Sequence, residues 1–332
     1  MKTLFLIAAI IAAFTANASA LAGRYGYVSN GNNDGQGSLR FALESGAKVI
    51  KISPKVSNVV LSEGLQYSRD GRLDIIGSGQ TIDGSALRSN DNILTISNGA
   101  NLYVSNLSFV GGLQGINDDP LTPVGGKGIY LHIPIERTGR VKVNLNNVSV
   151  LRVGNHGVHV SDCSLGDDCG GGSGGAGDGS PASISVILND VLINGVGFGK
   201  ADADGVRIDD RAAGDIYFAA NNSTFTNIGA DGIELDEGGN GSVIADVRNS
   251  VFNNNGEYCN LISRFEAGPC DDDGERDVDD GFDIDEAGDG DLYVSVLNTK
   301  VMNNFDEGLD FDEEVEGHIT IRLATVLVVN NA

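Results

Sequence analysis

A motif of the form Asp-Gly-apolar-x-apolar-Asp, with substitutions in its first copies, recurs along most of this chain. The glycines that mark its six copies are Gly128, Gly157, Gly205, Gly232, Gly281 and Gly308. Successive glycines are 29, 48, 27, 49 and 27 residues apart. The two long intervals each contain a Gly- or Asp-rich segment with two cysteines. One repeat of about 27 residues, interrupted by two insertions, therefore explains the whole series.

A second strand keeps the same register in every repeat. It alternates apolar and polar residues, as in Ile184, Val186 and Leu188, which predicts one buried face and one solvent-exposed face. Two positions further on comes a turn residue, which is Asn106, Asn147, Asp190, Asn222, Asn249, Asn298 or Thr325. Three short strands per repeat, stacked in register, predict an all-β, right-handed parallel β-helix. An antiparallel sandwich is the alternative, but it requires no fixed repeat.

Segments before the first repeat add a family resemblance. Gly37-Ser38-Leu39-Arg40-Phe41-Ala42-Leu43, Val49-Ile50-Lys51-Ile52 and Thr81-Ile82-Asp83-Gly84 resemble the N-terminal cap helix, first strand and first-coil turn of the secreted pectate-lyase-like superfamily. The resemblance implies a β-helix over most of residues 24–330, with a short cap helix near Ser38–Ser45. The chain departs from the family pattern in having no Trp-Ile-Asp-His calcium segment and no Arg-x-Pro-x-x-Arg segment, so no lyase site is carried over.

The chain begins with the features of an export signal. Met1-Lys2 gives a charged start, Leu4–Phe14 an apolar run, and Ala18-Ser19-Ala20 a small-residue cleavage pattern. We expect a signal peptide over 1–20, the alternative being a short buried helix, and a secreted or cell-surface protein in the periplasm or outside the cell. Residues 21–332 are expected to form one domain. Its parts are a cap at about 21–50, inserted loops at about 163–182 and 257–279, and acidic coils at 201–317.

Four cysteines lie in the two insertions. Export permits disulfides, and we expect the local pairs Cys163–Cys169 and Cys259–Cys270, although sequence alone leaves three pairings open. A zinc site is the alternative, but the spacing is not Cys-x-x-Cys and no histidines are nearby.

The formal net charge is −24, and it is concentrated in one region. Residues 201–317 hold 31 Asp and Glu but 6 Lys and Arg. An acidic chain has no electrostatic drive toward nucleic acid or anionic lipid, and no apolar run is long enough to span a membrane. Partners of those kinds are therefore not expected.

The repeat register arranges the acids in columns. The predicted metal ligands are Asp204, Asp209, Asp231, Glu234, Asp236, Asp280, Asp283, Asp285, Glu307, Asp310 and Asp312. Stacked strands are about 4.8 Å apart, so these carboxylates would repel one another or take up protons without a counterion. Oxygen-only ligation favours Ca²⁺, whereas a solvated acidic face is the plain alternative.

The first coils carry different side chains on the same face. Tyr130, His159 and Arg207 form one column, with His132, His156 and Lys127 beside it. Such a column suits a polysaccharide lyase in which His159 or Tyr130 removes a proton next to a uronate carboxylate and Arg207 binds that carboxylate. Ordinary exposed strand side chains are the alternative.

These observations lead to three hypotheses. The first is a calcium-loaded solenoid that binds a polysaccharide or another cell-envelope component. The second is a lyase that acts on an acidic glycan by β-elimination, and the third is a purely structural surface protein. The last coil ends at Asn330-Asn331-Ala332 without a cap, so either the chain is a piece of a longer protein or its end stacks on a partner in end-to-end association.

Overall fold

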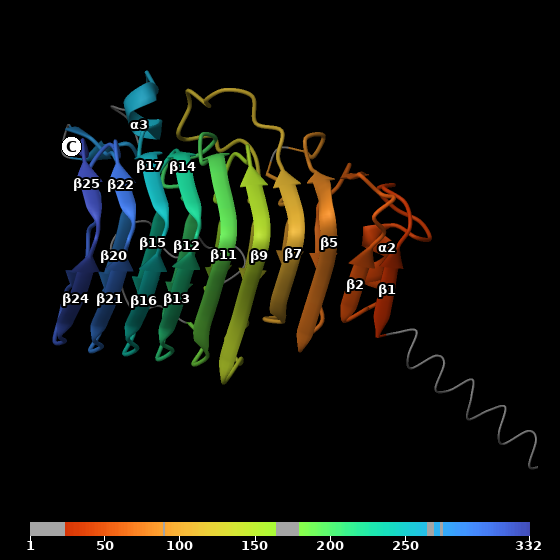
Figure 1. Ribbon diagram of the computed structural model, residues 1–332, viewed down its shortest axis with the longest axis horizontal. Helices are drawn as coiled ribbons and strands as arrows, with labels where there is room; N and C mark the ends of the chain where they lie inside the picture. Colours follow the sequence, from red (N-terminus) through yellow and green to blue (C-terminus); the bar gives the residue numbers. More distant parts are fainter. Residues whose placement is uncertain (1–23, 89, 164–178, 264–268, 273–274) are drawn as a thin grey trace, which may run out of the picture.

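The computed structural model describes residues 24–88, 90–163, 179–263, 269–272 and 275–332. The expected signal peptide lies outside these residues, as does most of the first insertion. Parallel strands follow one another in chain order along the longest axis, from β1 at one end to β25 at the other (Figure 1). The fold is a right-handed parallel β-helix, as predicted.

Two large parallel sheets form the walls of the described solenoid. The first has fifteen strands, whose main path is β1 (Tyr25–Val28), β2 (Val49–Ile52), β5 (Arg72–Asp83), β7 (Asn101–Val110), β9 (Arg140–Leu151), β11 (Ser183–Val196), β13 (Ile216–Asn221), β16 (Val243–Arg248), β21 (Leu292–Leu297) and β24 (Ile319–Ala324). Beside this path lie β3 (Asn58–Val60), β14 (Thr224–Ile228), β17 (Val251–Asn255), β22 (Lys300–Met302) and β25 (Leu327–Val329).

The second sheet carries the Gly-apolar-x-apolar motifs. Its eight strands are β4 (Leu65–Tyr67), β6 (Leu94–Ile96), β8 (Ile129–His132), β10 (Val158–Ser161), β12 (Val206–Asp210), β15 (Ile233–Glu237), β20 (Phe282–Glu286) and β23 (Asp312–Glu313). A small antiparallel pair, β18 (Asp271–Asp272) and β19 (Glu275–Arg276), belongs to the second insertion, which also contains helix α3 (Tyr258–Leu261).

Three strand positions per coil were predicted, and the structure joins two of them in one sheet. The long strand β11 pairs with β13 through its first half and with β14 through its second. The bend falls at the predicted turn residues, all seven of which have φ between 51° and 57°. Asparagine tolerates this left-handed region better than most residues. Asn side chains also bond from coil to coil, since Asn147 Nδ2 donates to Asn106 Oδ1 at 2.9 Å.

The core is a set of stacked apolar columns. Ile184, Val186 and Leu188 of β11 align with Ile216, Phe218 and Ala220 of β13, and all six are buried. Three phenylalanine rings stack further along, with centroids 5.0 Å apart for Phe225–Phe252 and 5.7 Å apart for Phe252–Phe282. Each coil therefore buries its apolar face against the coils on either side.

Helix α2 (Leu39–Glu44) lies at the N-terminal end of the solenoid, as predicted (Figure 1). Its N-cap is Ser38, whose Oγ accepts the backbone N–H of Phe41 at 3.1 Å. Its buried residues are Leu39, Ala42 and Leu43. Neither described helix has the length or the apolar character that crossing a bilayer requires.

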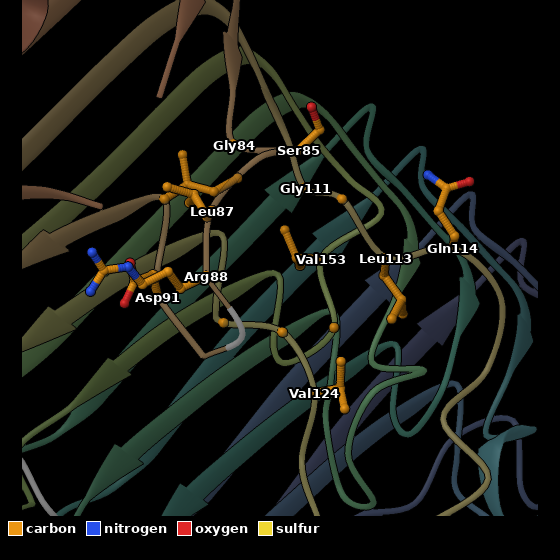
Figure 2. Close-up of a pocket in the computed structure, with 15 residues that line it drawn as sticks. Gly84, Ser85, Leu87, Arg88, Asp91, Gly111, Leu113, Gln114, Val124 and Val153 are labelled. Atoms are coloured by element: carbon orange, nitrogen blue, oxygen red, sulfur yellow. The ribbon is translucent and has the colours of Figure 1, made fainter. Parts of the chain in front are cut away.

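The last described coil differs from the others in exposure. Ile319, Ile321 and Leu323 continue the inward-facing column but are 47%, 45% and 52% exposed, because no described coil lies beyond them. End-to-end association through this coil stays a prediction, which the mass in solution tests. In the N-terminal half of the solenoid, a cavity opens where the turns after β5, β7 and β9 meet (Figure 2).

Candidate functional site

The second sheet brings the predicted acid columns into register. Arg207 of β12 pairs with Glu234 of β15, which pairs with Asp283 of β20. The next column contains Asp209, Asp236, Asp285 and Asp312. These predicted carboxylates therefore stand on adjacent coils of the sheet. The remaining ones lie in the segments just before β12, β15, β20 and β23, and they are Asp204, Asp231, Asp280, Glu307 and Asp310.

A solvated acidic face was the alternative to metal binding, and that alternative is wrong for the central coils of this face. Asp204, Asp209 and Asp236 are 0% exposed, and Arg207 is 2% exposed. The charged side chains of neighbouring coils contact one another, and Asp202, from the loop before β12, lies against Arg207. The strands of this region are consequently buried on both faces.

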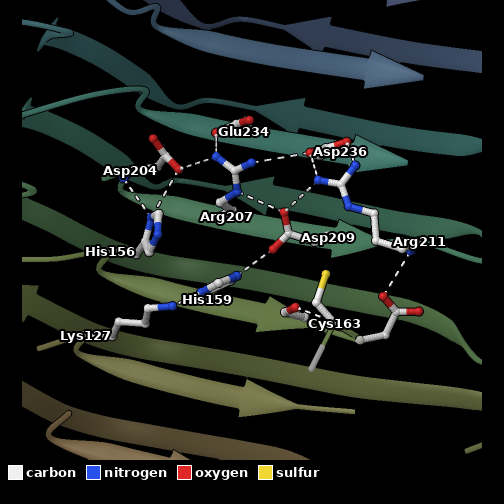
Figure 3. A network of polar contacts seen from close by, with 12 residues as sticks. Lys127, His156, His159, Cys163, Asp204, Arg207, Asp209, Arg211, Glu234 and Asp236 are labelled. Carbon is white, nitrogen blue, oxygen red and sulfur yellow. Dashed lines mark hydrogen bonds and ion pairs between the residues drawn. The ribbon is translucent and has the colours of Figure 1, made fainter. Parts of the chain in front are cut away.

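Arg207 is the centre of a buried ion-pair network (Figure 3). Its Nε donates to Asp209 at 2.9 Å, and one terminal nitrogen donates both to Asp202 at 2.9 Å and to Glu234. The other terminal nitrogen donates to Asp236 at 3.3 Å. Burial opposes ionisation, but Glu234 and Asp209 hold the pKa of Arg207 well above its usual value. One guanidinium thus contacts acids from three segments of chain.

Arg211 extends this network beyond the strand. Both of its terminal nitrogens donate to Asp236, one of them at 2.7 Å, and its backbone N–H donates to Asp162 at 3.0 Å. Sequence reasoning missed Arg211 and Asp202 because neither belongs to a repeat column.

His159 lies between a cation and an anion. Its Nδ1 is 2.5 Å from Lys127 Nζ, and its Nε2 is 2.5 Å from Asp209 Oδ2. Burial and then Lys127 lower the pKa of His159 to about 4, so the ring is neutral at pH 7. The partners assign the tautomer, in which Nδ1 accepts from Lys127 and Nε2–H donates to Asp209.

The three predicted catalytic residues do lie on neighbouring strands. Tyr130 pairs with His159, and His159 pairs with Arg207, in the predicted register. The Tyr130 and His159 ring centroids are 5.2 Å apart, and all three side chains are buried. Both ring nitrogens of His159 are engaged, and acids already occupy Arg207, so this geometry gives the lyase hypothesis no support.

The acidic side chains of the later coils lie in a different environment from those around Arg207. Asp280, Glu307 and Asp310 each place a carboxylate oxygen within 4.8 Å of the other two. Asp280 is 8% exposed, and its Oδ1 is buried without a hydrogen-bond partner among the described residues. Burial and then Glu307, Asp310 and Asp306 raise the pKa of Asp280 to about 8. The charged groups that act on Asp280 here are all acidic.

Two further carboxylate groups lie along the same face. In the first, Asp202, Asp204 and Glu234 surround the Arg207 guanidinium, so the protein supplies its own cation. In the second, Glu234 meets Asp283 and Asp285 of the next coil. Burial and nearby acids, Asp285 first among them, raise the pKa of Asp283 well above its usual value.

Sequence reasoning also missed a column of carboxyl groups at the ends of these strands. Asp210, Glu237, Glu286 and Glu313 pair in register, one position beyond the predicted column. Glu237 Oε1 accepts the backbone N–H groups of Gly239 at 3.1 Å and Gly241 at 3.3 Å. Its Oε2 is buried without a hydrogen-bond partner in the described structure. The sequence signal for this column is an acidic residue five positions after each of the last four motif glycines.

The second insertion is held by the predicted Cys259–Cys270 disulfide. Both cysteines are buried with Tyr258 and Ile262 in a small apolar cluster. Tyr258 Oη donates to the backbone oxygen of Asn117 at 2.8 Å, which ties two distant loops together. Cys163 is also disulfide-bonded, but its predicted partner Cys169 lies outside the described residues.

Comparisons with known proteins add a likeness of low identity. No protein-family model matches this chain. No curated protein matches it either. Among solved structures, a Geobacillus virus E2 protein described as ORF18 is similar, with 11% identity and a TM-score of 0.47. The similarity covers 97% of this chain and 63% of that one.

Proposed function

We propose that this protein is an extracellular, calcium-loaded β-helix that holds Ca²⁺ on its acidic coils and binds a glycan or another cell-envelope component. The observation that carries the proposal is the group formed by Asp280, Glu307 and Asp310. It combines three converging carboxylates with a buried oxygen, Asp280 Oδ1, that has no hydrogen-bond partner in the described structure. A buried, unsatisfied carboxylate oxygen is costly unless a cation or a proton meets it.

The coil of β12 shows how a positive charge can lie among these carboxylates. There the guanidinium of Arg207 lies among Asp202, Asp204 and Glu234. In the next two coils, Glu234 and Asp283 stand at the register position of Arg207. An acidic side chain therefore replaces the basic one at this position. A bound cation would restore the balance that Arg207 provides one coil earlier.

The chemistry of these groups suits calcium. All the candidate ligands are carboxylate oxygens, which hard cations prefer. Ca²⁺ accepts about six to eight oxygens in flexible geometry, whereas Mg²⁺ demands a near-ideal octahedron. Glu307 is exposed and Asp310 half-buried, so water or ligand oxygens have room to complete the shell.

Calcium binding is tested by thermal unfolding of chelator-treated protein with increasing Ca²⁺. We expect the midpoint to rise, with stabilisation of about 2.7 kcal/mol when free Ca²⁺ reaches about 100 times its Kd. Asp280→Asn should greatly reduce the response. The matched control is Asp289→Asn, which removes an exposed charge from the adjacent turn and should respond as wild type. Wild-type protein that shows no shift, or Asp280→Asn protein that shifts fully, would contradict the proposal.

An extracellular location and a glycan partner complete the proposal. A buried disulfide between Cys259 and Cys270 is compatible with an oxidising compartment. The net charge of −24 disfavours nucleic acid and anionic membranes as partners. Binding to a glycan array with calcium and with chelator tests the partner class.

A further inference from the structure

A cavity of about 280 Å³ lies on the first coils, away from the acidic columns. The connections after β5, β7 and β9 line it, with residues from 84–88, 91–93, 111–114, 124–126 and 153–154. Figure 2 shows Leu87, Leu113, Val124 and Val153 around the hollow, with Arg88 and Asp91 together on one side. Its volume is near the lower end of the range for small-molecule sites, about 300–1,000 Å³.

Glycine backbone builds the wall of this cavity. A Cβ on Gly126 would lie 2.2 Å from the backbone oxygen of Asp91, and one on Gly154 would lie 2.0 Å from that of Val124. Glycines at both positions let the turns approach more closely than side chains would allow. Backbone at these two glycines therefore forms part of the cavity wall.

The lining combines an apolar floor with a polar rim. The apolar side chains are Leu87, Ile93, Leu113, Val124 and Val153. The polar side chains are Ser85, Arg88, Asp91 and Gln114, of which Ser85, Arg88 and Gln114 are exposed. A sugar ring has the same two characters, since its C–H face packs on aliphatic groups and its hydroxyls bond to donors and acceptors at the rim.

A second, polar hollow continues from the first. It has a volume of about 450 Å³ and shares Arg88 and Asp91 with the cavity. Its other polar side chains are Glu63, Gln66, Asn90 and Asn92. The Asn92 amide already bonds to Lys127 N at 2.8 Å and Thr95 Oγ1 at 3.2 Å, which leaves Glu63, Gln66 and Asn90 for a ligand.

We infer that the cavity binds the terminal residue of a neutral oligosaccharide, whose following residues lie over the polar hollow. Two acids and one base line the combined site, a balance that does not favour an anionic sugar. The inference rests on the glycan-binding part of the proposed function and is independent of its calcium part, because none of the acid groups described above contributes to the lining.

The test uses an array of neutral hexose and N-acetylhexosamine oligosaccharides, with polyuronates as the charged comparison. Val124 is 38% exposed and lines the cavity, so Val124→Trp fills the hollow without disturbing the buried core. The matched control is Val315→Trp, at a 57% exposed position on the last described coil. We expect wild type and Val315→Trp to bind a neutral oligosaccharide equally, with and without chelator. Binding by Val124→Trp should be at least about tenfold weaker, a loss of about 1.4 kcal/mol.

Rim variants keep the test decisive if Val124→Trp does not fold. Arg88→Ala and Gln114→Ala change exposed side chains and should weaken the same binding. The inference is overturned if no neutral oligosaccharide binds, if polyuronates alone bind, or if filling the cavity and trimming its rim leave affinity unchanged. Calcium-dependent stabilisation is measured separately, so its failure would leave this site standing, and failure here would leave the calcium site standing.

Discussion

At the scale of single residues, Arg207 supplies the positive charge on which the buried acids of its coil depend. Its five nitrogen–oxygen contacts reach acids of its own strand, of the preceding loop and of the next coil. Asp209 also accepts from His159 and Asp236 from Arg211, but Asp202 and Glu234 would lose the guanidinium that they contact. The protein is therefore more sensitive to this side chain than to any single acid around it.

We expect Arg207→Ala to lower the free energy of unfolding by about 3–5 kcal/mol, the usual result of leaving buried charges without a partner. Denaturant unfolding in the presence of chelator measures the change. The control is Arg72→Ala, which breaks an exposed pair with Asp74 and should lower the free energy of unfolding by about 0–1 kcal/mol. Equal losses for the two variants would contradict the role given to Arg207. Added Ca²⁺ should restore part of the Arg207→Ala loss, since the substitution leaves a group of acids like those of the later coils.

His159 has no nitrogen available to a substrate. Lys127 meets Nδ1 and Asp209 meets Nε2, each at 2.5 Å, inside a buried network. We therefore expect wild-type protein to release no unsaturated sugar from polyuronates, as followed by ultraviolet absorbance. Product formed by wild type and lost in His159→Ala would revive the lyase hypothesis instead.

At the scale of strands, the alternation of apolar and polar residues predicts which face of the sheet each side chain is on. It does not predict whether the polar face is buried. Val206 and Ile208 of β12 were expected to face inward and do, and Arg207 and Asp209 were expected on the opposite face. Their burial was not predictable, because Asp202 and Arg211 reach this face from outside the repeat columns. Six of the turn residues were predictable because Asn and Asp tolerate φ > 0, a local property, whereas Thr325 was predictable only from its place in the repeat register. The Glu237 column lies one position beyond the end of the repeat motif, so the motif did not include it.

The Glu237 column gives a pH dependence with a definite sign. Burial and then Glu286 raise the pKa of Glu237 to about 9, from a usual value of 4.5. A carboxyl group whose pKa is raised on folding stabilises in full below its unfolded pKa. That stabilisation is lost as the pH rises through the folded value. We expect the thermal midpoint of chelator-treated wild type to fall between about pH 5 and about pH 9.

Replacing the Glu237 carboxyl group by an amide separates its contribution to the pH dependence from that of the other titratable groups. Glu237→Gln keeps an oxygen for the N–H groups of Gly239 and Gly241 but takes up no charge. Its midpoint should fall less steeply over the same pH range than that of wild type. Glu316→Gln, at an exposed position, should follow wild type. Parallel curves for wild type and Glu237→Gln would show that this column does not ionise as inferred.

At the scale of the whole molecule, charge and stability are distributed unevenly along one axis. The first coils are close to neutral, and the acids are concentrated in residues 201–317. In a solenoid each coil contacts mainly its neighbours, so stability is approximately a sum of local terms. A ligand bound at one end should therefore stabilise the coils near it and leave distant ones unchanged.

Hydrogen exchange should reveal this localisation when calcium is added to chelator-treated protein. We expect slower exchange in β15, β20 and the strands beside them, which carry or adjoin the acidic groups, and unchanged exchange in β7 and β9. The protection should disappear in Asp280→Asn and persist in Asp289→Asn. Equal protection of all coils would mean that the cation tightens the solenoid as one cooperative unit. Protection confined to the first coils would instead move the cation site away from the acidic columns altogether.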